Sequence, residues 1–572
     1  MKRFLIITTL VGVMGQLLGN DVAVDQANFL AKVDVEHLLD GKDGALYAEQ
    51  VGLAKDLQIS EIADFFGCQT LSGRNYLERS LNLPISPKSI CGTVEKRQKL
   101  IRALVNDPEL KAKVDVLLAE AKAAEQTVVE LFSVAFRSEF CPEEKQLELL
   151  RQMNHPYYGF NKYLFKNPVG RMVKSGVEVF NVASNTGLAV FYNKYDMKGM
   201  AVFHAALAGF SAYSFAQDYK SGLAKRNKLH ALTEIIKVAA DLELLCAENN
   251  LDTQFSCSQM IENSDLKNVI DELKRTRYTQ KTSYAFAFPL VHSFLYDIYE
   301  KEKCLAGLFA SIAEIDSCNA IATKMLEQQD KGNQFCFVNF IDQNRPEFRA
   351  KKLWNVLVGA EKAVANDLAE VRNVILSGNN AGGKTTLIRA ILQNIVLGQT
   401  YGVAAAEEFN FTQFDVVHSY LNISDNLTGH KSLFDAEVSR AQDINNKMNS
   451  LAPDAKYFFA LDELFTATAA AQGAECAKAF VQNLSDNVQT QFIYATHFDG
   501  LKQMVDGMSN CANYHVDSVP KLADGSRARR VDGRLAYPYT VSAGASYDNV
   551  ALEIADDAGL FGNKKPATAA AA

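Results

Sequence analysis

The sequence predicts a multi-domain protein in which a helical region is followed by an α/β phosphate-loop (P-loop) NTPase domain. A glycine-rich loop follows the apolar run Val371–Leu376, and a second apolar run, Tyr457–Leu461, ends in two acidic residues. Short apolar runs of this kind are typical of buried parallel strands. Residues 21–150 instead contain stretches with an apolar residue every three to four positions, which indicates helices. With 572 residues, 48% of them apolar, the chain is long enough for roughly two to four domains.

The glycine-rich loop, residues 378–386, reads Gly-Asn-Asn-Ala-Gly-Gly-Lys-Thr-Thr and matches the phosphate-loop pattern G-x-x-x-x-G-K-[ST]. Glycines let backbone N–H groups turn inward around phosphates, and the N-terminus of the following helix adds partial positive charge. We expect Lys384 to reach the β- and γ-phosphates and the Thr385 hydroxyl to bind Mg²⁺. The alternative, a glycine-rich turn that matches by chance, is disfavoured by the apolar run before the loop and the helix-compatible run after it. The residues expected to bind ATP or GTP are Gly378, Asn379, Asn380, Ala381, Gly382, Gly383, Lys384, Thr385 and Thr386.

Polar residues follow two further predicted strands. Asp462 and Glu463 end the run Tyr457–Leu461, and His497 follows the run Phe492–Ala495. Taken singly, the two carboxylates could be surface residues and the histidine a structural one. Because the carboxyl ends of parallel strands meet where α/β sheets bind ligands, we favour a catalytic interpretation. Asp462 is then expected to hold Mg²⁺, Glu463 to polarise the attacking water and His497 to sense the γ-phosphate.

The block from Ile375 to about Gly559 resembles the ATPase domain of the MutS family of DNA mismatch-repair ATPases. The family loop typically runs G-P-N-M-G-G-K-S-T; Asn379 replaces its proline and Ala381 its methionine. Residues 425–437 are similar to the family pattern D-D-L-x-x-G-x-S-T-F-x-x-E. ABC transporter and chromosome-structure ATPases share this fold, but they carry an L-S-G-G-Q signature shortly before the Asp-Glu strand, and this sequence has none there. The MutS resemblance is therefore the better one.

The resemblance implies an ATP hydrolase with ATP and Mg²⁺ as cofactors. In the family, the asparagine at Asn380 lies beside the γ-phosphate and the attacking water. The serine at Ser432 lies against the γ-phosphate of the opposite subunit, which implies a homodimer through the ATPase domains. The aromatic residue that stacks on adenine in the family is replaced by Ala363, so the adenine contact stays open. The expected catalytic residues are Glu463, His497, Asn380 and, in trans, Ser432, and the expected metal ligands are Thr385 and Asp462.

The expected partner is DNA of low sequence specificity. Thr70, Gly73 and Arg74 are similar to the T-x-x-G-x-R start of the family's helical core domain. No Phe-x-Glu, the wedge with which the family reads mismatches, precedes that motif, and too few residues follow Leu560 for the family's helix-turn-helix. The net charge of −8 and the lack of a long basic run also weaken the prediction of a DNA-wrapping surface. These differences argue against mismatch reading and leave the ATPase prediction intact.

The first 20 residues contain a basic start and an apolar stretch in the order found in export signals. Met1-Lys-Arg precedes the apolar stretch Phe4–Val13. Because an exported ATPase would lack ATP, the segment is either an anchor with the enzyme on the cytosolic side or a buried helix. We expect a cytoplasmic protein, with membrane association through this segment as the open alternative.

A second weakly charged stretch spans residues 179–217. No charged residue occurs from Gly199 to Gln217, and small residues recur at Ala201, Ala205 and Gly209, as in packed membrane helices. Two interpretations stay open, a hairpin that contacts lipid and a buried helical hairpin. Polar residues within the stretch, and a length that barely reaches the ~20 residues a bilayer needs, favour the buried hairpin.

These predictions combine into a helical core and lever region joined to a C-terminal ATPase. The nucleotide cycle would switch a clamp on mismatched or structured DNA; the alternative function is a membrane-tethered ATPase scaffold that acts on a protein partner. The expected domains are a signal-like or anchor segment (1–20), a helical core domain (21–150), a shortened helical lever (151–290), return helices of the core (291–350), a MutS-type ATPase domain (351–562) and a disordered tail (563–572).

Overall fold

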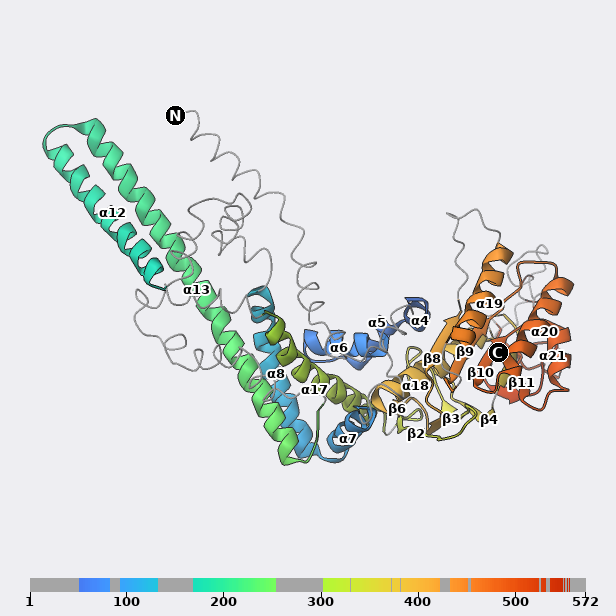
Figure 1. Ribbon diagram of the computed structural model, residues 1–572. Coiled ribbons are helices and arrows are strands. Elements are labelled where there is room, and N and C mark those ends of the chain that lie inside the picture. Colours follow the sequence, from blue (N-terminus) through green and yellow to red (C-terminus); the bar gives the residue numbers. More distant parts are fainter. Residues whose placement is uncertain are drawn as a thin grey trace, which may run out of the picture. The chain divides into compact units, whose positions relative to one another are not determined.

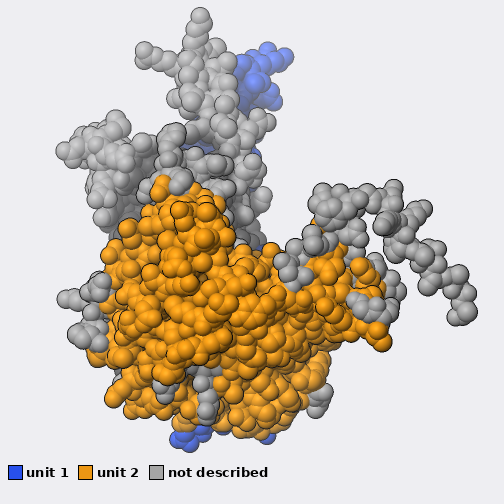
Figure 2. All heavy atoms as spheres, turned by 90° about the vertical axis from the view of Figure 1, so that its right-hand side faces the viewer, with its two compact units in different colours: residues 1–38, 68–76, 109–317 blue, residues 39–67, 77–108, 318–572 orange. Residues whose placement is uncertain are grey.

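The computed structural model describes residues 51–82, 93–131, 168–253, 302–329, 331–371, 373–380, 382–421, 433–450, 454–523, 526–530, 535–548, 550, 553 and 555. The predicted anchor segment (1–20) and tail (563–572) lie outside these residues. The chain divides into two compact units, which Figure 2 colours separately. Unit 1 takes in the described residues of 68–76 and 109–317, and unit 2 those of 39–67, 77–108 and 318–572. The residues of the expected helical core, 21–150, are divided between these units, since residues 51–67 and 77–108 belong to the same unit as the predicted ATPase.

Unit 1 is helical in the part that the structure describes. Apolar side chains from three of its helices, Leu118, Leu232 and Phe309, are fully buried. Its helices are α8 (Pro108–Leu131), α12 (Pro168–Lys194), α13 (Lys198–Glu248), and the first parts of α6 (Leu71–Asn82) and α17 (Glu302–Gln328).

Two buried carboxylates hold the start of α6. Asp316 Oδ2 accepts hydrogen bonds from the Thr70 backbone N–H at 2.7 Å and the Thr70 hydroxyl at 2.6 Å. Glu125 accepts from the backbone N–H groups of Leu71 at 2.6 Å and Ser72 at 2.8 Å. The first N–H groups of a helix lack partners within the helix, so side chains of α8 and α17 supply them here. This contact places residues of the Thr70–Arg74 motif at a helix start.

Helices α12 and α13 form the hairpin at the upper left of Figure 1. They meet through small and polar side chains: Ala201 and Ala208 are buried, and His204 Nδ1 lies 2.8 Å from Asn185 Oδ1. The large apolar side chains point outward, and Phe210 is 73% exposed. The expectation of a buried hairpin is therefore wrong, because large apolar side chains of both helices, such as Phe180 and Phe210, are exposed. None of the helices in the described part of the chain is both long and apolar enough to cross a membrane.

Unit 2 contains a six-stranded sheet of order β12-β11-β5-β10-β9-β8, parallel except for β12. The predicted strands at Tyr457–Leu461 and Phe492–Ala495 are confirmed as β9 and β10, and their side chains are buried along these runs. Consecutive apolar residues fit such strands because helices cover a parallel sheet. The strands are β5 (Asn373–Ser377), β8 (Val416–Tyr420), β9 (Tyr457–Asp462), β10 (Thr490–Ala495), β11 (Cys511–Val516) and β12 (Val541–Ala543), and the helices after them are α18 (Lys384–Tyr401), α19 (Leu433–Ser450), α20 (Ala470–Asp486) and α21 (Asp499–Val505).

A second sheet combines strands that precede the phosphate loop with a strand that follows it. Residues 291–350 were expected to be return helices, but α17 ends at Gln328 and strands begin at Cys336, so this prediction is wrong for residues 331–350. The sheet has the order β2-β7-β3-β4, and β1 pairs with β6. Its strands are β1 (Cys336–Phe337), β2 (Asn339–Phe340), β3 (Phe348–Leu353), β4 (Asn366–Val371), β6 (Val403–Ala404) and β7 (Glu408–Phe411).

Three N-terminal helices complete unit 2 as far as it is described. Asp56 accepts hydrogen bonds from the Ser419 hydroxyl at 2.8 Å and from the Leu421 N–H at 3.1 Å, so it ties the first of these helices to the end of β8. Arg97 donates to the Thr400 carbonyl oxygen at the end of α18. The helices are α4 (Val51–Leu57), α5 (Ile59–Phe66) and α7 (Thr93–Asn106).

Candidate functional site

The predicted phosphate loop connects β5 to α18. Gly378 has φ of 139° and Gly383 has φ of 106°, values that residues with a side chain rarely adopt. Gly383 is also the residue before the first turn of α18, which begins at Lys384. The two glycines therefore allow the tight turn that brings the N-terminus of α18 to the carboxyl end of β5.

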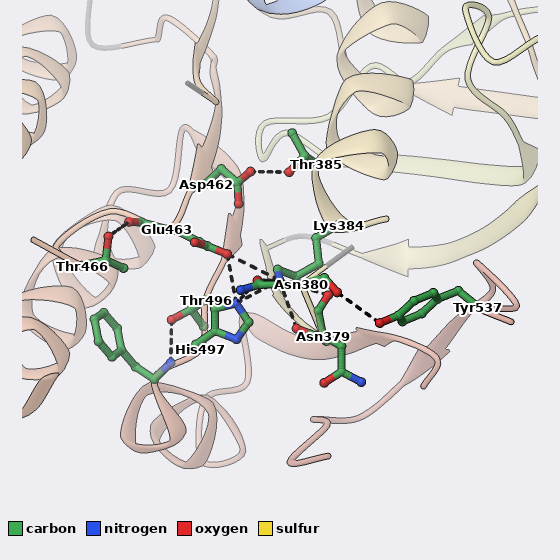
Figure 3. A network of polar contacts seen from close by, with 12 residues as sticks. Asn379, Asn380, Lys384, Thr385, Asp462, Glu463, Thr466, Thr496, His497 and Tyr537 are labelled. Carbon is green, nitrogen blue, oxygen red and sulfur yellow. Dashed lines mark hydrogen bonds and ion pairs between the residues drawn. The ribbon is translucent and has the colours of Figure 1, made fainter. Parts of the chain in front are cut away.

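Lys384 is buried at this turn, with its side chain 5% exposed. Its ammonium donates to the Gly378 carbonyl oxygen at 3.0 Å, and it lies 3.1 Å from His497 Nε2 and 3.5 Å from Glu463 Oε1 (Figure 3). Burial lowers the pKa of Lys384, and the nearby Glu463 and Asp462 oppose this shift. Phosphate oxygens would provide the negative charge that stabilises a buried ammonium.

Asp462 and Thr385 form a pair suited to a metal ion. The Thr385 hydroxyl donates to Asp462 Oδ2 at 2.6 Å, while Asp462 Oδ1 is buried and has no hydrogen-bond partner among the described residues. Burial raises the pKa of Asp462, and the Thr385 hydrogen bond acts against this rise. A buried carboxylate oxygen without a donor, beside a hydroxyl, fits Mg²⁺, which takes oxygen ligands.

Glu463, His497 and Asn380 make a polar network beside the loop. His497 Nε2 lies 3.0 Å from Glu463 Oε1 and 2.8 Å from Asn380 Oδ1 (Figure 3). The hydrogen bond with His497 is the main reason that the pKa of Glu463 is lowered, and Lys384 lowers it further. Glu463 therefore keeps the ionised form that a general base needs.

A cavity of about 510 Å³ opens beside the loop. Lys384, Thr385 and Glu463 form its polar side, and Val364 and Tyr539 lie on its apolar side. This volume is in the range of small-molecule sites, which are commonly apolar with a few placed polar groups. The cavity can therefore accept a nucleotide base and ribose next to the phosphate loop, although the family's aromatic is absent at Ala363.

The sequence analysis missed the residues that reach the loop from the C-terminal segment. Asn379 Nδ2 donates to Ser518 Oγ at 2.9 Å, and the Tyr537 hydroxyl lies 3.4 Å from the Asn380 carbonyl oxygen. No sequence pattern marks these contacts, because more than a hundred residues separate the partners. The two tyrosines of Tyr537-Pro-Tyr539 are the one feature that could have indicated a ligand pocket, since aromatic residues are common in such pockets.

The structure brings most of the predicted site residues together. They come from the carboxyl ends of the adjacent strands β5, β10 and β9, as expected for an α/β sheet. Ala381 and Ser432 lie outside the described residues. The residues that meet are Asn380, Lys384, Thr385, Asp462, Glu463 and His497.

Comparisons with known proteins agree with the motifs in the C-terminal part. Residues 374–565 match the family model of MutS domain V. The DNA mismatch repair protein MutS of Lactococcus lactis subsp. lactis is 25% identical over 207 residues, which are 36% of this chain and 23% of that protein. MutS of Streptococcus agalactiae serotype Ia is 22% identical over 263 residues, 45% of this chain and 28% of that protein. The match thus spans less than a third of the length of each relative, and it confirms the resemblance drawn from the motifs.

Proposed function

Because the C-terminal part of this chain belongs to the MutS family, we propose that the protein hydrolyses ATP to ADP and phosphate with Mg²⁺. The observation that carries the proposal is the convergence of Lys384, Asp462 and Glu463 beside one cavity. A buried ammonium, a carboxylate–hydroxyl pair and an ionised carboxylate are the three groups that phosphoryl transfer to water requires.

Each group has one role in this proposal. Lys384 and the loop N–H groups bind the phosphates, and Thr385 with Asp462 holds Mg²⁺, which neutralises charge on the phosphate oxygens when it is bound. Glu463 orients the attacking water and accepts its proton. His497 Nε2 lies 3.0 Å from Glu463 Oε1 and 2.8 Å from Asn380 Oδ1, so the histidine links the carboxylate to the phosphate loop.

Phosphate release from ATP by the full chain tests the proposal. We expect turnover with Mg²⁺ and its loss when EDTA removes the metal. A matched Lys478→Ala variant, which changes a lysine that pairs with Glu475 on α20, should turn over like the wild type. Absence of both ATP binding and turnover in a folded protein would refute the proposal.

We further propose that DNA is the macromolecular partner and that two chains act together through Ser432. The support is the match to the family model of MutS domain V and the similarity to proteins named DNA mismatch repair protein MutS. The expected DNA contacts are with phosphates, so affinity should fall steeply with salt and be equal for matched and mismatched duplexes. Fluorescence anisotropy with both duplexes measures this. A mismatch preference above about tenfold, which is ~1.4 kcal/mol, would instead mean that the chain reads bases.

A further inference from the structure

Glu437 is a fully buried carboxylate in the second turn of α19, with 0% of its side chain exposed. A buried carboxylate is stable only where hydrogen-bond donors satisfy it. Its Oε1 accepts from the Thr466 backbone N–H at 3.1 Å, and its Oε2 accepts from the Ala467 backbone N–H at 3.2 Å. Glu437 therefore binds the backbone of the loop that follows Glu463.

This loop has an unfavourable backbone conformation. Glu463 has φ of 53° and Phe465 has φ of 68°, and both values lie in the left-handed region that favours glycine. A residue with a side chain stays in this region only where its surroundings hold it there. The direction in which the Glu463 side chain leaves the backbone depends on that conformation.

Groups from β10 hold the first residues of the loop, Glu463 and Leu464. The Glu463 N–H donates to the Ala495 carbonyl oxygen at 3.0 Å, and the Tyr494 hydroxyl donates to the Leu464 carbonyl oxygen at 2.7 Å. The Thr466 hydroxyl connects the two parts, because it donates to the Glu463 carbonyl oxygen at 3.0 Å (Figure 3) and lies 3.4 Å from Glu437 Oε1. Glu437 thus holds the turn at Thr466 and Ala467, and the same turn begins at Glu463, which carries the catalytic carboxylate.

We propose that Glu437 is a positioning residue for ATP hydrolysis. By holding the N–H groups of Thr466 and Ala467, it keeps the loop in the turn that directs the Glu463 carboxylate to His497 and the phosphate loop. The inference rests on the proposed function, since the orientation of Glu463 affects a rate only if Glu463 acts on the attacking water.

Glu437→Gln in the full chain tests the inference. The amide keeps the size of the side chain but turns an NH₂ group toward one of the two loop N–H donors, so one hydrogen bond is lost. We expect kcat for Mg²⁺-ATP to fall at least about tenfold, because small misplacements of a catalytic group are costly. KM and the affinity for ATP should stay unchanged, and amide hydrogen exchange should accelerate in residues 464–468.

Asn445→Ala is the matched control. Asn445 is also on α19, two turns after Glu437, and its side chain accepts a hydrogen bond from Asn483 on α20 at 2.9 Å. Wild-type kcat in Glu437→Gln would overturn the inference. Equal losses in both variants, or a joint loss of kcat and ATP affinity in Glu437→Gln, would also overturn it, because they indicate a general weakening of the fold.

Thr466→Val keeps the inference testable if Glu437→Gln does not fold. Thr466 is exposed, so removing its hydroxyl should leave folding intact and lower kcat by about threefold at constant KM, as expected for one neutral hydrogen bond. Unchanged kcat would contradict the positioning role.

Hydrogen exchange is measured without nucleotide, so it separates the proposal of ATP hydrolysis from the proposal that Glu437 positions Glu463. A wild type that does not hydrolyse ATP removes the proposed function, whereas unchanged exchange in Glu437→Gln removes the role of Glu437.

Discussion

At the scale of single residues, the site depends on a charged group that the fold buries, the Lys384 ammonium. Lys384 is surrounded by the Gly378 carbonyl oxygen, His497 and Glu463, and burial lowers its pKa. Phosphate oxygens would take the place of these partners around the ammonium.

Lys384→Ala should weaken ATP binding by about ten- to a hundredfold. The change removes the ammonium aimed at the phosphates, and a charge-assisted hydrogen bond to a buried group contributes roughly 1.5–3 kcal/mol. Titration with a fluorescent ATP analogue measures the affinity, with Lys478→Ala as the control for loss of a lysine in the same unit. Wild-type affinity in the Lys384 variant would show that the loop does not bind phosphates through this residue.

His418 gives a pH dependence that is independent of the site. It lies in β8, 7% exposed; its Nε2 has no hydrogen-bond partner among the described residues, and burial lowers its pKa to about 3. The nearby Lys447 lowers this pKa further. In the unfolded chain a histidine has a pKa of about 6.5, so the unfolded state binds the proton first as the pH falls.

The unfolding free energy should therefore decrease by about 1.4 kcal/mol per pH unit below about 6.5 because of His418. His418→Phe keeps an aromatic ring against Tyr420 and removes this titration. Between pH 6.5 and pH 5, we expect the unfolding free energy of the variant to fall by about 2 kcal/mol less than that of the wild type. Denaturant titrations at several pH values measure the difference, and parallel pH profiles would contradict the assignment.

At the scale of elements, the start of α6 shows why a glycine occupies the Thr70–Arg74 motif. A Cβ at Gly73 would overlap the Asp316 carboxylate, which already accepts three hydrogen bonds from Gln69 and Thr70. Burial raises the pKa of Asp316, so its hydrogen bonds offset the cost of keeping a carboxyl group inside the protein.

Gly73→Ala should destabilise unit 1 by about 1–3 kcal/mol, the usual cost of forcing extra atoms into a packed interior. Gly187→Ala is the matched control, because Gly187 lies within α12 and a Cβ added there would meet open space. That variant should gain about 0.5–1 kcal/mol, since alanine favours helices. Thermal unfolding of both variants measures these two changes in stability, which should have opposite signs. Equal changes in the two variants would contradict the packing around Asp316.

The hairpin of α12 and α13 shows the limit of composition as a signal. Uncharged runs predicted helices there, and helices form. The same composition suggested burial, but Phe180 and Val202 are about 70% exposed because the small residues face the partner helix. The side that a helix buries depends on its neighbour, and an average over all residues does not reveal it.

At the scale of the whole molecule, the sequence predicted those site residues that directly follow an apolar run of the chain. Strand β9 ends in Asp462, and strand β10 is followed by Thr496 and His497, so an apolar run with a polar end located each of them. The second sheet had no such signal, because β2 and β7 are short and pair across about 70 residues. The turn of Glu463 into the left-handed region could not be predicted either, because it depends on Glu437 and Tyr494, which lie elsewhere in the chain.

A homodimer with shared sites makes a prediction about mixed variants. Lys384→Ala and Ser432→Ala should each be inactive alone, the first through lost phosphate binding and the second through a lost contact in trans. In a mixture, heterodimers contain one site with both Lys384 and Ser432 intact, so about a quarter of the wild-type turnover should return. Turnover of the mixture at the level of the separate variants would indicate that Ser432 does not act across an interface.

Glu463→Gln tests the central claim, that this site hydrolyses ATP with Glu463 as its base, most directly. The amide keeps the shape of the side chain but cannot accept the proton of water. In single-turnover experiments with Mg²⁺-ATP, we predict binding within a few-fold of wild type and hydrolysis slower by roughly 10²–10⁴-fold, the usual contribution of a general base. Hydrolysis at the wild-type rate by this variant would contradict the account.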